Sequence, residues 1–243
     1  MLRAGVFVLL LGMPVAAQVK VRLAPQTQEA FDQYIATAEA GMDFEARFTA
    51  QSKPGEVRVA PWGRDGVFDA PDGMIHDWAA SAVAPRATAE KILSVLQNYA
   101  AYKIVYAPEV VESHMASRDG NHWHPHLKLV KRKALMIALN TDYDVEYRAL
   151  RGGRWAVISH STRIAELDGK NELEPGYDHG FLWRLNAYWL IEPRPEGVYL
   201  ECRTISLTRD LPPGLGWMLR PMVSTLPRES LQKTLEATLR AVH

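Results

Sequence analysis

The sequence predicts an α+β fold in which a curved antiparallel sheet wraps around a long C-terminal helix. Two observations support this prediction. Seven strand-like segments lie between residues 74 and 208, and only one helical segment interrupts them. An amphipathic helical segment follows the last strand. Strands that succeed one another through short turns favour an antiparallel sheet, because parallel neighbours need long crossover connections.

The strand segments are apolar and β-branched runs that end at turn residues. They span residues 74–84, 109–117, 122–131, 136–147, 155–165, 181–191 and 198–208. Asp119 and Gly120, a pair typical of hairpin turns, separate the second segment from the third. In the fourth segment acidic residues alternate with apolar ones: Asp142, Asp144 and Glu146 against Tyr143, Val145 and Tyr147. This alternation predicts that the two sets point to opposite faces of the sheet.

The C-terminal helix is expected to begin at about Pro227. Its apolar residues fall at i, i+4, i+8 and i+11, which is one stripe of a helix: Leu231, Leu235, Leu239 and Val242. Proline suits the first helical turn, where a backbone N–H would be unpaired in any case. We expect this stripe to lie on the sheet, with a ligand held in the space between them.

Three parts of the chain are distinguished by their patterns. Residues 1–17 carry Arg3, a short apolar run and a small-residue site ending at Ala17, which is typical of a secretory signal peptide. Residues 18–73 are expected to form an N-terminal helical extension with a linker, with a helix over 27–50 and one short strand at 56–60. Residues 74–243 form the main domain, which has a further helix over 87–99. The expected location is periplasmic or secreted.

Composition excludes several classes of function. A hydrophobic content of 47% with 23% charged residues is ordinary for a protein with a sizeable core. The 28 basic and 28 acidic residues balance, so no nucleic-acid partner is expected. Cys202 is the only cysteine and lies in an apolar run, which predicts a buried thiol rather than a nucleophile. No glycine-rich phosphate loop is present, and we expect no cofactor.

The order of elements and four short stretches, residues 108–110, 181–189, 211–219 and 227–231, carry a resemblance to a known family. In these features the chain resembles the START/birch-pollen-allergen superfamily, also called SRPBCC or helix-grip proteins, over about residues 74–243. The residues of these stretches are similar to those of bacterial members that are polyketide-cyclase-like or coenzyme-Q-binding-like. The resemblance implies a helix-grip fold, with a ligand cavity between the sheet and the C-terminal helix. Members of the superfamily bind lipids, quinones, polyketides or hormones and share no catalytic motif.

Two functions are weighed against each other, and a collapsed core without a cavity, with only a scaffolding or interaction role, is the third possibility. The first is non-catalytic binding or transport of an apolar small molecule, such as a lipid, isoprenoid or polyketide-like compound. The second is a cyclase or dehydratase that uses His160, Glu201 or Tyr188 on the bound ligand. We favour the first, because no acid–base constellation can be assembled from the sequence. A monomer that makes a transient contact with membrane surfaces is expected.

The candidate ligand-binding residues are mostly aromatic, and a few are polar. Aromatic side chains that line a cavity, together with a few polar groups, are what a site for an apolar ligand requires. The candidates are Trp78, Tyr143, His160, Arg163, Trp183, Asn186, Tyr188, Glu201 and Trp217. His160 and Arg163 are expected to point to opposite faces of one strand, so that only one of them can look into a cavity. The alternative for each aromatic residue is a place in the core.

The histidines of the third strand segment allow two interpretations. His122, His124 and His126 would project from one face of a strand, where a metal site is conceivable. Residues two apart on a strand stand roughly 6.5–7 Å apart, however, so three in a row do not easily reach one ion. We therefore expect a polar edge strand and no metal. The basic residues that follow, Lys128, Lys131, Arg132 and Lys133, are expected to pair with the acidic face of the next strand.

Overall fold

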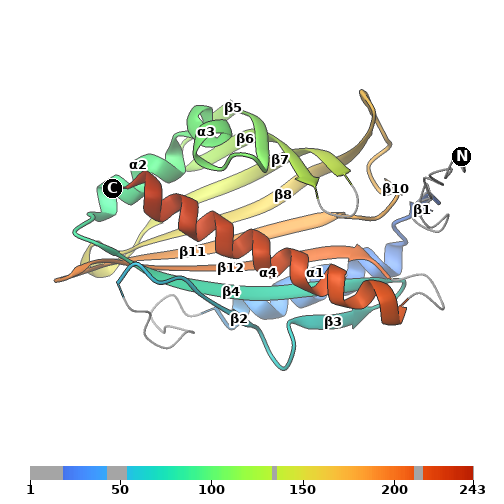
Figure 1. The fold of residues 1–243 in the computed structure, drawn as a ribbon, viewed down its shortest axis with the longest axis horizontal. Helices are drawn as coiled ribbons and strands as arrows, with labels where there is room; N and C mark the ends of the chain where they lie inside the picture. The colour runs from blue at the N-terminus through green and yellow to red at the C-terminus, as the bar shows by residue number, and fades with distance from the viewer. Residues whose placement is uncertain (1–18, 43–53, 133–135, 211–215, 243) are drawn as a thin grey trace, which may run out of the picture.

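The computed structural model of the chain describes residues 19–42, 54–132, 136–210 and 216–242, with side chains from Thr225 onward in the last range. Ten strands form one open antiparallel sheet (Figure 1). Eight of them lie side by side in this order: β2 (Arg58–Pro61), β4 (Gly73–Pro85), β12 (Gly197–Arg209), β11 (Arg184–Arg194), β8 (Trp155–Asp168), β7 (Met136–Ala149), β6 (His122–Arg132) and β5 (Val110–Asp119). β3 (Val67–Ala70) also pairs with β4, and β9 (Asn171–Glu172) with β8. β1 (Val21–Arg22) and β10 (Tyr177–Asp178) form a separate pair.

The predicted α+β helix-grip fold is confirmed. All seven predicted strands are present as β4 to β8, β11 and β12, and every pairing between them is antiparallel. β2 falls on the strand expected at 56–60, whereas β3 was not predicted. Both short strands pair with β4, so residues 58–70 extend the main sheet. The N-terminal helix, α1, spans Pro25–Ala40; residues 43–53 lie outside the described residues.

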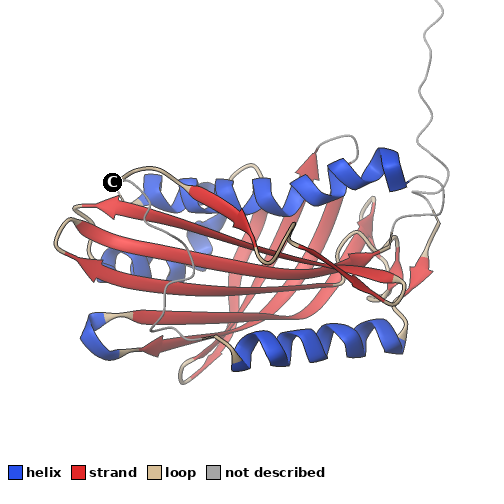
Figure 2. Ribbon diagram, turned by 90° about the horizontal axis from the view of Figure 1, so that it is seen from below, coloured by secondary structure: helices blue, strands red, loops and turns tan. Residues whose placement is uncertain are grey.

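Helices cover both faces of the sheet. α4 (Gly216–Ala241) crosses one face over β4, β2 and β12, and α1 lies against the opposite face (Figure 2). α2 (Ala89–Gln97) and the short α3 (Tyr102–Val105) lie on the same side as α4 and contact it. We call the two sides of the sheet the α4 face and the α1 face. Trp78 and Cys202 pack on the α4 face, whereas Ile75 and Ile205 pack on the α1 face.

The apolar stripe of α4 is the centre of the larger core. Leu231, Leu235, Leu239 and Val242 are at most 7% exposed and pack against the sheet and α2, as the sequence predicted. α2 is held in place at its N-terminus, where the Thr88 hydroxyl accepts a hydrogen bond from the Lys91 N–H at 3.3 Å.

The predicted start of the C-terminal helix at Pro227 is wrong, because α4 begins at Gly216 and includes both Pro221 and Pro227. A proline inside a helix removes one backbone hydrogen bond, which argued for a helix start. The cost is offset because α4 packs along the sheet over much of its length. Among the described residues, no helix is long and apolar enough to cross a membrane.

The sheet has an irregular strand at one of its edges. β5 pairs with β6 on one side only, and its register shifts twice, between Val110 and Glu112 and between Met115 and Ser117. Each shift places an extra residue on one strand, which is the geometry of a β-bulge. The other edge, β2, is contacted by α4.

Candidate functional site

The predicted site residues are divided between the two faces of the sheet. Trp78 and Tyr143 lie on the α4 face and are 8% and 7% exposed. Six others lie on the α1 face: His160, Arg163, Trp183, Asn186, Tyr188 and Glu201. Trp217 belongs to the part of α4 whose side chains are outside the described residues. The six residues therefore point away from α4. The expectation that His160 and Arg163 point to opposite faces is wrong, because the register shift opposite Asp142 and Tyr143 adds a residue to β8 between them and turns both to the α1 face.

A buried ion pair fixes α1 to its face of the sheet. Arg203 donates from Nε to Asp77 Oδ1 at 2.9 Å and from Nη2 to Oδ2 at 2.5 Å. Asp77 is fully buried and Arg203 is 6% exposed. Tyr34 of α1 donates its hydroxyl to Asp77 Oδ2 at 2.8 Å, and the Arg203 guanidinium stacks on the Trp62 ring at 3.7 Å. Burial and the Asp77 charge raise the pKa of Tyr34, so its hydroxyl stays a hydrogen-bond donor at neutral pH.

A second polar cluster holds the C-terminal end of α1. Glu39 Oε1 accepts a hydrogen bond from the Tyr188 hydroxyl at 2.7 Å and lies 2.6 Å from His160 Nε2. Burial, reinforced by the bond to Glu39, raises the pKa of Tyr188. Asn186 donates to the Tyr188 hydroxyl at 3.4 Å and accepts from the Ser161 N–H at 3.3 Å. Two of the residues suggested for acid–base catalysis, His160 and Tyr188, thus bind a helix on the α1 face.

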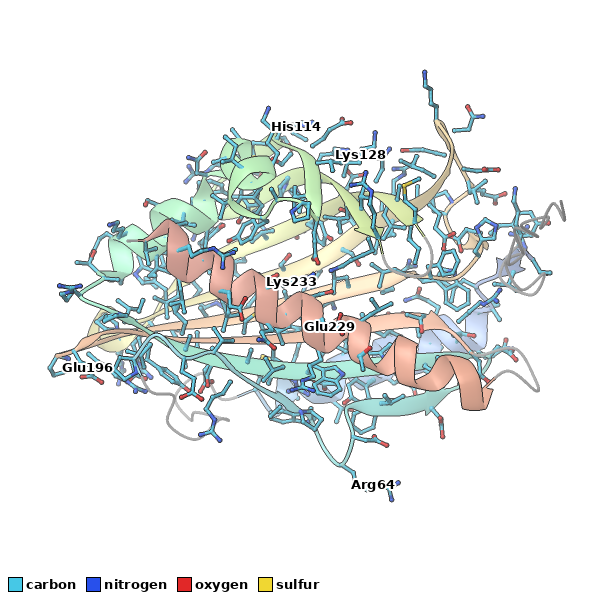
Figure 3. All side chains as sticks on the ribbon, viewed as in Figure 1. Arg64, His114, Lys128, Glu196, Glu229 and Lys233 are labelled. Carbon is cyan, nitrogen blue, oxygen red and sulfur yellow. The ribbon has the colours of Figure 1, made fainter. Side chains whose placement is uncertain are left out.

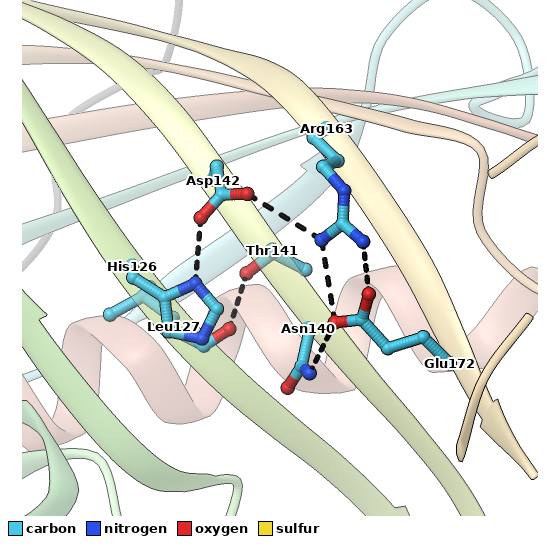
Figure 4. Close-up of polar contacts among 7 residues, drawn as sticks. All are labelled: His126, Leu127, Asn140, Thr141, Asp142, Arg163 and Glu172. Atoms are coloured by element: carbon cyan, nitrogen blue, oxygen red, sulfur yellow. Dashed lines mark hydrogen bonds and ion pairs between the residues drawn. The ribbon is translucent and has the colours of Figure 1, made fainter. Parts of the chain in front are cut away.

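Arg163 belongs to a surface network across β7, β8 and β9 (Figure 4). Its guanidinium donates to the Glu172 carboxylate and lies 3.6 Å from Asp142 Oδ2. Asn140 also donates to Glu172, at 2.6 Å, and His126 Nδ1 lies 2.6 Å from Asp142 Oδ1. The hydrogen bond from Arg163 lowers the pKa of Glu172. Since Arg163 and both carboxylates are more than a third exposed, water screens these pairs.

Glu201 is buried on the α1 face. It is 2% exposed, and its carboxylate accepts a hydrogen bond from the Tyr199 hydroxyl, two residues away on the same strand. The Arg194 guanidinium lies over the Tyr199 ring at 3.8 Å. The Glu201 carboxylate is therefore bonded within β12, near the turn that joins β11 to β12.

One end of the α4 face is closely packed core. Here β4 presents three alanines in alternate positions, Ala80, Ala82 and Ala84, each at 0% exposure. Such small side chains let the leucine stripe of α4 approach the strand. Trp189 and Ile191 continue the layer on β11, and both are buried. The only cysteine, Cys202, lies in the same layer, and burial raises the pKa of its thiol, as expected for an unreactive cysteine.

Four tyrosines that were not predicted as site residues gather beneath α2 and α3. They are Tyr99, Tyr102, Tyr106 and Tyr147. The Tyr99 and Tyr147 hydroxyls lie 2.8 Å apart, and Tyr147 and Tyr102 both donate to the Leu96 carbonyl. Tyr106 pairs with Thr238 of α4 at 3.1 Å, and burial raises the pKa of Tyr106 to about 12. Tyr99, Tyr102 and Tyr106 are three and four residues apart, and side chains at such spacings lie on the same side of a helix. This spacing was the sequence signal that these rings meet.

The middle of the α4 face is less covered than its packed end. Leu185 and Ala187 on β11 and Ser159 and Ser161 on β8 point to this face and are half-buried. Further along the same strands, Trp189, Ile191 and Val157 on the same face are buried. Both strands lie in the interior of the sheet, where complete coverage by a helix would bury all of them. All four side chains are uncharged, and three of them are small.

The histidines of β6 make cross-strand pairs on the α1 face. His122 Nδ1 lies 3.0 Å from Asp144 Oδ1, and the bond to Asp144 raises the pKa of His122. His124 Nδ1 lies 3.8 Å from the same oxygen. Within the described part of the chain, no three His, Cys, Asp or Glu side chains lie where they could hold a metal ion together.

The expected pairing of the basic residues with the acidic face of β7 is wrong, because the β6 histidines lie against Asp142 and Asp144 and Arg148 donates to Glu146. Lys128 pairs with Glu112 of β5 at 2.8 Å (Figure 3 labels Lys128 and Lys233). Lys131 and Lys233 both pair with Glu109. Lys133 lies outside the described residues.

No protein-family model matches the chain, and no curated protein matches its sequence. Among solved structures, the STAR-related lipid transfer protein from Xanthomonas axonopodis is 16% identical, with a TM-score of 0.46, over 76% of this chain and 96% of that one. Human STARD10 is 12% identical, with a TM-score of 0.49, over 93% of this chain and 84% of that one. The Zhui aromatase/cyclase from Streptomyces is 13% identical, with a TM-score of 0.45, over 70% and 91%.

The chain is similar to these structures at identities of 16% or less and with TM-scores below 0.5. At such low identity the likeness says nothing about which residues act. Function therefore has to be argued from the site. The site offered by this chain is an uncharged, partly open stretch of the α4 face, next to a layer of buried aromatic rings.

Proposed function

We propose that the protein binds an apolar small molecule between the middle of the α4 face and α4. The observation that supports this is the half-buried state of Leu185, Ala187, Ser159 and Ser161 on interior strands of the sheet. Small, uncharged side chains leave room above the sheet and provide no partner for a charged ligand. Apolar walls with a few hydroxyl groups are the usual lining of a site for an apolar molecule. Lipids, isoprenoids and polyketide-like compounds are the candidates.

The proposed role is binding or transport without catalysis. The cyclase or dehydratase alternative depended on His160, Glu201 and Tyr188. His160 and Tyr188 bind Glu39 of α1, and Glu201 accepts from Tyr199, all on the face away from α4. A general acid or base must come within hydrogen-bond reach of its substrate. These three residues do not meet that requirement for a ligand under α4.

Native mass spectrometry and thermal unfolding test the proposal together. Protein purified from its own host should carry a co-purifying apolar molecule. A panel of lipids, isoprenoid alcohols and aromatic polyketides should contain compounds that raise the unfolding temperature, because a ligand that binds only the folded state stabilises it. Absence of both effects would contradict the proposal.

A filling substitution locates the site. Ala187→Phe should abolish ligand binding and change the free energy of unfolding by less than about 1 kcal/mol, because the new ring occupies open space. If the middle of the α4 face is solid core, overpacking should instead cost about 1–3 kcal/mol. The matched control is Ile158→Phe, on the α1 face of the neighbouring strand, where Ile158 is partly buried against the apolar cluster of Phe31, Tyr188 and Ile205. The control should lower stability and leave ligand affinity unchanged.

We further propose that residues 1–17 direct export and that the mature chain acts as a monomer in the periplasm or outside the cell, in transient contact with membrane surfaces. The arginine, apolar run and small-residue site of the first residues support this. N-terminal sequencing of the protein from its host should give Gln18 as the first residue. Light scattering should give the mass of one chain, and sedimentation with vesicles should show weak, reversible association.

A further inference from the structure

His76 of β4 is a buried histidine on the α4 face with one unsatisfied nitrogen. The side chain is 1% exposed. Its Nε2 lies 3.0 Å from the Thr208 hydroxyl on β12. Its Nδ1 is buried and has no hydrogen-bond partner among the described residues. A buried polar atom without a partner is uncommon in folded proteins and calls for an explanation.

The neighbouring hydrogen bond defines which nitrogen carries the proton. The Thr208 hydroxyl donates its hydrogen to the Arg209 carbonyl at 3.2 Å. We therefore assign it as the acceptor of a hydrogen bond from His76, which puts the proton of the neutral ring on Nε2 and a lone pair on Nδ1. Burial lowers the pKa of His76 to about 4, so the ring is neutral at pH 7. Nδ1 is thus a hydrogen-bond acceptor.

The described side chains beside His76 on the α4 face of β4 and β12 are uncharged. Ser206 of β12 stands directly opposite His76 and is followed across the sheet by Leu185 of β11, which is half-buried. On β4 and β12, Asp77, Glu201 and Arg203 are on the α1 face, and Arg209 donates to the Val19 carbonyl at 3.1 Å. A neutral acceptor among uncharged groups does not favour a carboxylate or a phosphate. It favours a neutral group that donates a hydrogen bond.

We propose that His76 is the polar end of the ligand site and that its Nδ1 accepts a hydrogen bond from a hydroxyl group of the ligand. This inference rests on the proposed function, since it assigns a ligand class to the same site. The ligand is an apolar molecule with a neutral hydroxyl at one end, such as a long-chain alcohol. The rest of the molecule lies along the half-buried small residues of β11 and β8.

Three probes that share one alkyl chain test the proposal: 1-dodecanol, 1-methoxydodecane and dodecanoate. Affinity is measured by isothermal calorimetry and by the change in tryptophan fluorescence. The alcohol should bind on the order of 10-fold more tightly than the ether, because the ether leaves Nδ1 unsatisfied. Dodecanoate should also bind more weakly than the alcohol at pH 7, because it is an anion without a donor.

Two substitutions separate the two nitrogens of His76. His76→Asn places an amide oxygen near the position of Nδ1 and should keep the preference for the alcohol over the ether. His76→Gln places its amide near Nε2, where it can still bond Thr208, and should bind the two probes equally. Thermal unfolding of both variants is recorded as a check on folding. A preference that persists in His76→Gln would overturn the inference.

The wild-type protein also gives a test that does not depend on a variant folding. With ¹⁵N-labelled histidine, 1-dodecanol should shift the Nδ1 resonance of the buried neutral histidine, and 1-methoxydodecane should not. Equal affinity for alcohol and ether, without this shift, would overturn the role of His76 and leave the proposed function intact. Failure of the protein to bind any of the three probes would count against the proposed function and the inference together.

Discussion

The two faces of the sheet are covered by helices that are held in different ways. α1 is fixed by directed bonds to charged groups, through Asp77 and Arg203 at one point and Glu39 and His160 at another. α4 is held mainly by burial of its leucine stripe. Directed bonds specify one partner, whereas apolar burial is non-directional and can be shared with another apolar molecule. The comparison teaches that the polar groups of the α1 face are committed to holding α1, whereas the α4 face keeps the uncharged stretch to which we assign the proposed ligand.

The largest effect is expected from breaking the buried ion pair of the α1 face. Arg203→Met leaves the Asp77 carboxylate buried without its cation and should lower the free energy of unfolding by about 3–5 kcal/mol. Urea denaturation measures the loss. Adding Asp77→Asn to the same chain removes the buried charge and should recover much of it. If Arg203→Met alone were as stable as the wild type, α1 would not be held by this ion pair.

A smaller loss is expected from truncating the stripe of α4. Leu235→Ala removes a side chain at 0% exposure and should cost about 2–5 kcal/mol. Arg240→Ala, on the exposed side of the same helix, is the control and should change stability by no more than about 0.5 kcal/mol. A cost below about 1 kcal/mol for Leu235→Ala would mean that the ligand space reaches the stripe, which would move the boundary between packed core and site.

Glu39→Ala tests whether the two faces are independent. It removes the acceptor for Tyr188 and His160 and should cost about 1 kcal/mol, because Glu39 and His160 are more than a third exposed and screened by water. Hydrogen exchange should become faster in α1 and stay unchanged in α4. Glu39→Gln, which keeps one oxygen, should show a weaker effect. Loss of ligand binding in Glu39→Ala would contradict the assignment of separate roles to the α1 face and the α4 face.

The smallest effect concerns Glu166 and Asp178, two buried carboxylates. Burial and the charge of Asp178 raise the pKa of Glu166, and burial raises that of Asp178. A carboxyl group with a raised pKa in the folded state stabilises the protein below its unfolded pKa. That contribution is lost as pH rises through the folded pKa.

Asp178→Asn removes one charge, and its remaining oxygen can still accept from the Gly180 N–H and the Trp183 indole. The variant should therefore gain stability over the wild type near pH 7, and the gain should shrink as the pH is lowered toward the usual carboxyl range. Thermal unfolding of both proteins across this range measures the difference. A difference independent of pH would show that burial does not penalise the charged form of Asp178.

Strand order, helix positions and the stripe of α4 could be predicted from sequence because each has a local signal. The faces of some strands could be predicted as well. Alternation in β7 correctly separated buried Tyr143 from half-exposed Asp142, because one face of β7 meets solvent. In β4 and β12 almost every residue is buried, since α1 covers the second face. Alternation is then absent from the sequence, and nothing indicated that Glu201 points toward the α1 side.

The candidate site could not be predicted for the same reason, because the sequence carries no signal for which residues share a face of the sheet. Its half-buried residues are small and lack any motif, so only their position on the sheet distinguishes Ala187 from other alanines. His76 looked like one polar residue in an apolar strand, and its significance depends on Thr208, 132 residues away. Contacts over such distances in the sequence cannot be read from local periodicity.

The two register shifts in β5 have a consequence for how the molecule meets its own copies. A straight edge strand presents a regular row of unpaired N–H and C=O groups, onto which a strand of another molecule can add. In β5 the bulges interrupt that row, and the exposed Glu112 and Arg118 place charges along it. The open sheet is thereby protected against growth by edge-to-edge aggregation, and this protection does not require the sheet to close into a barrel.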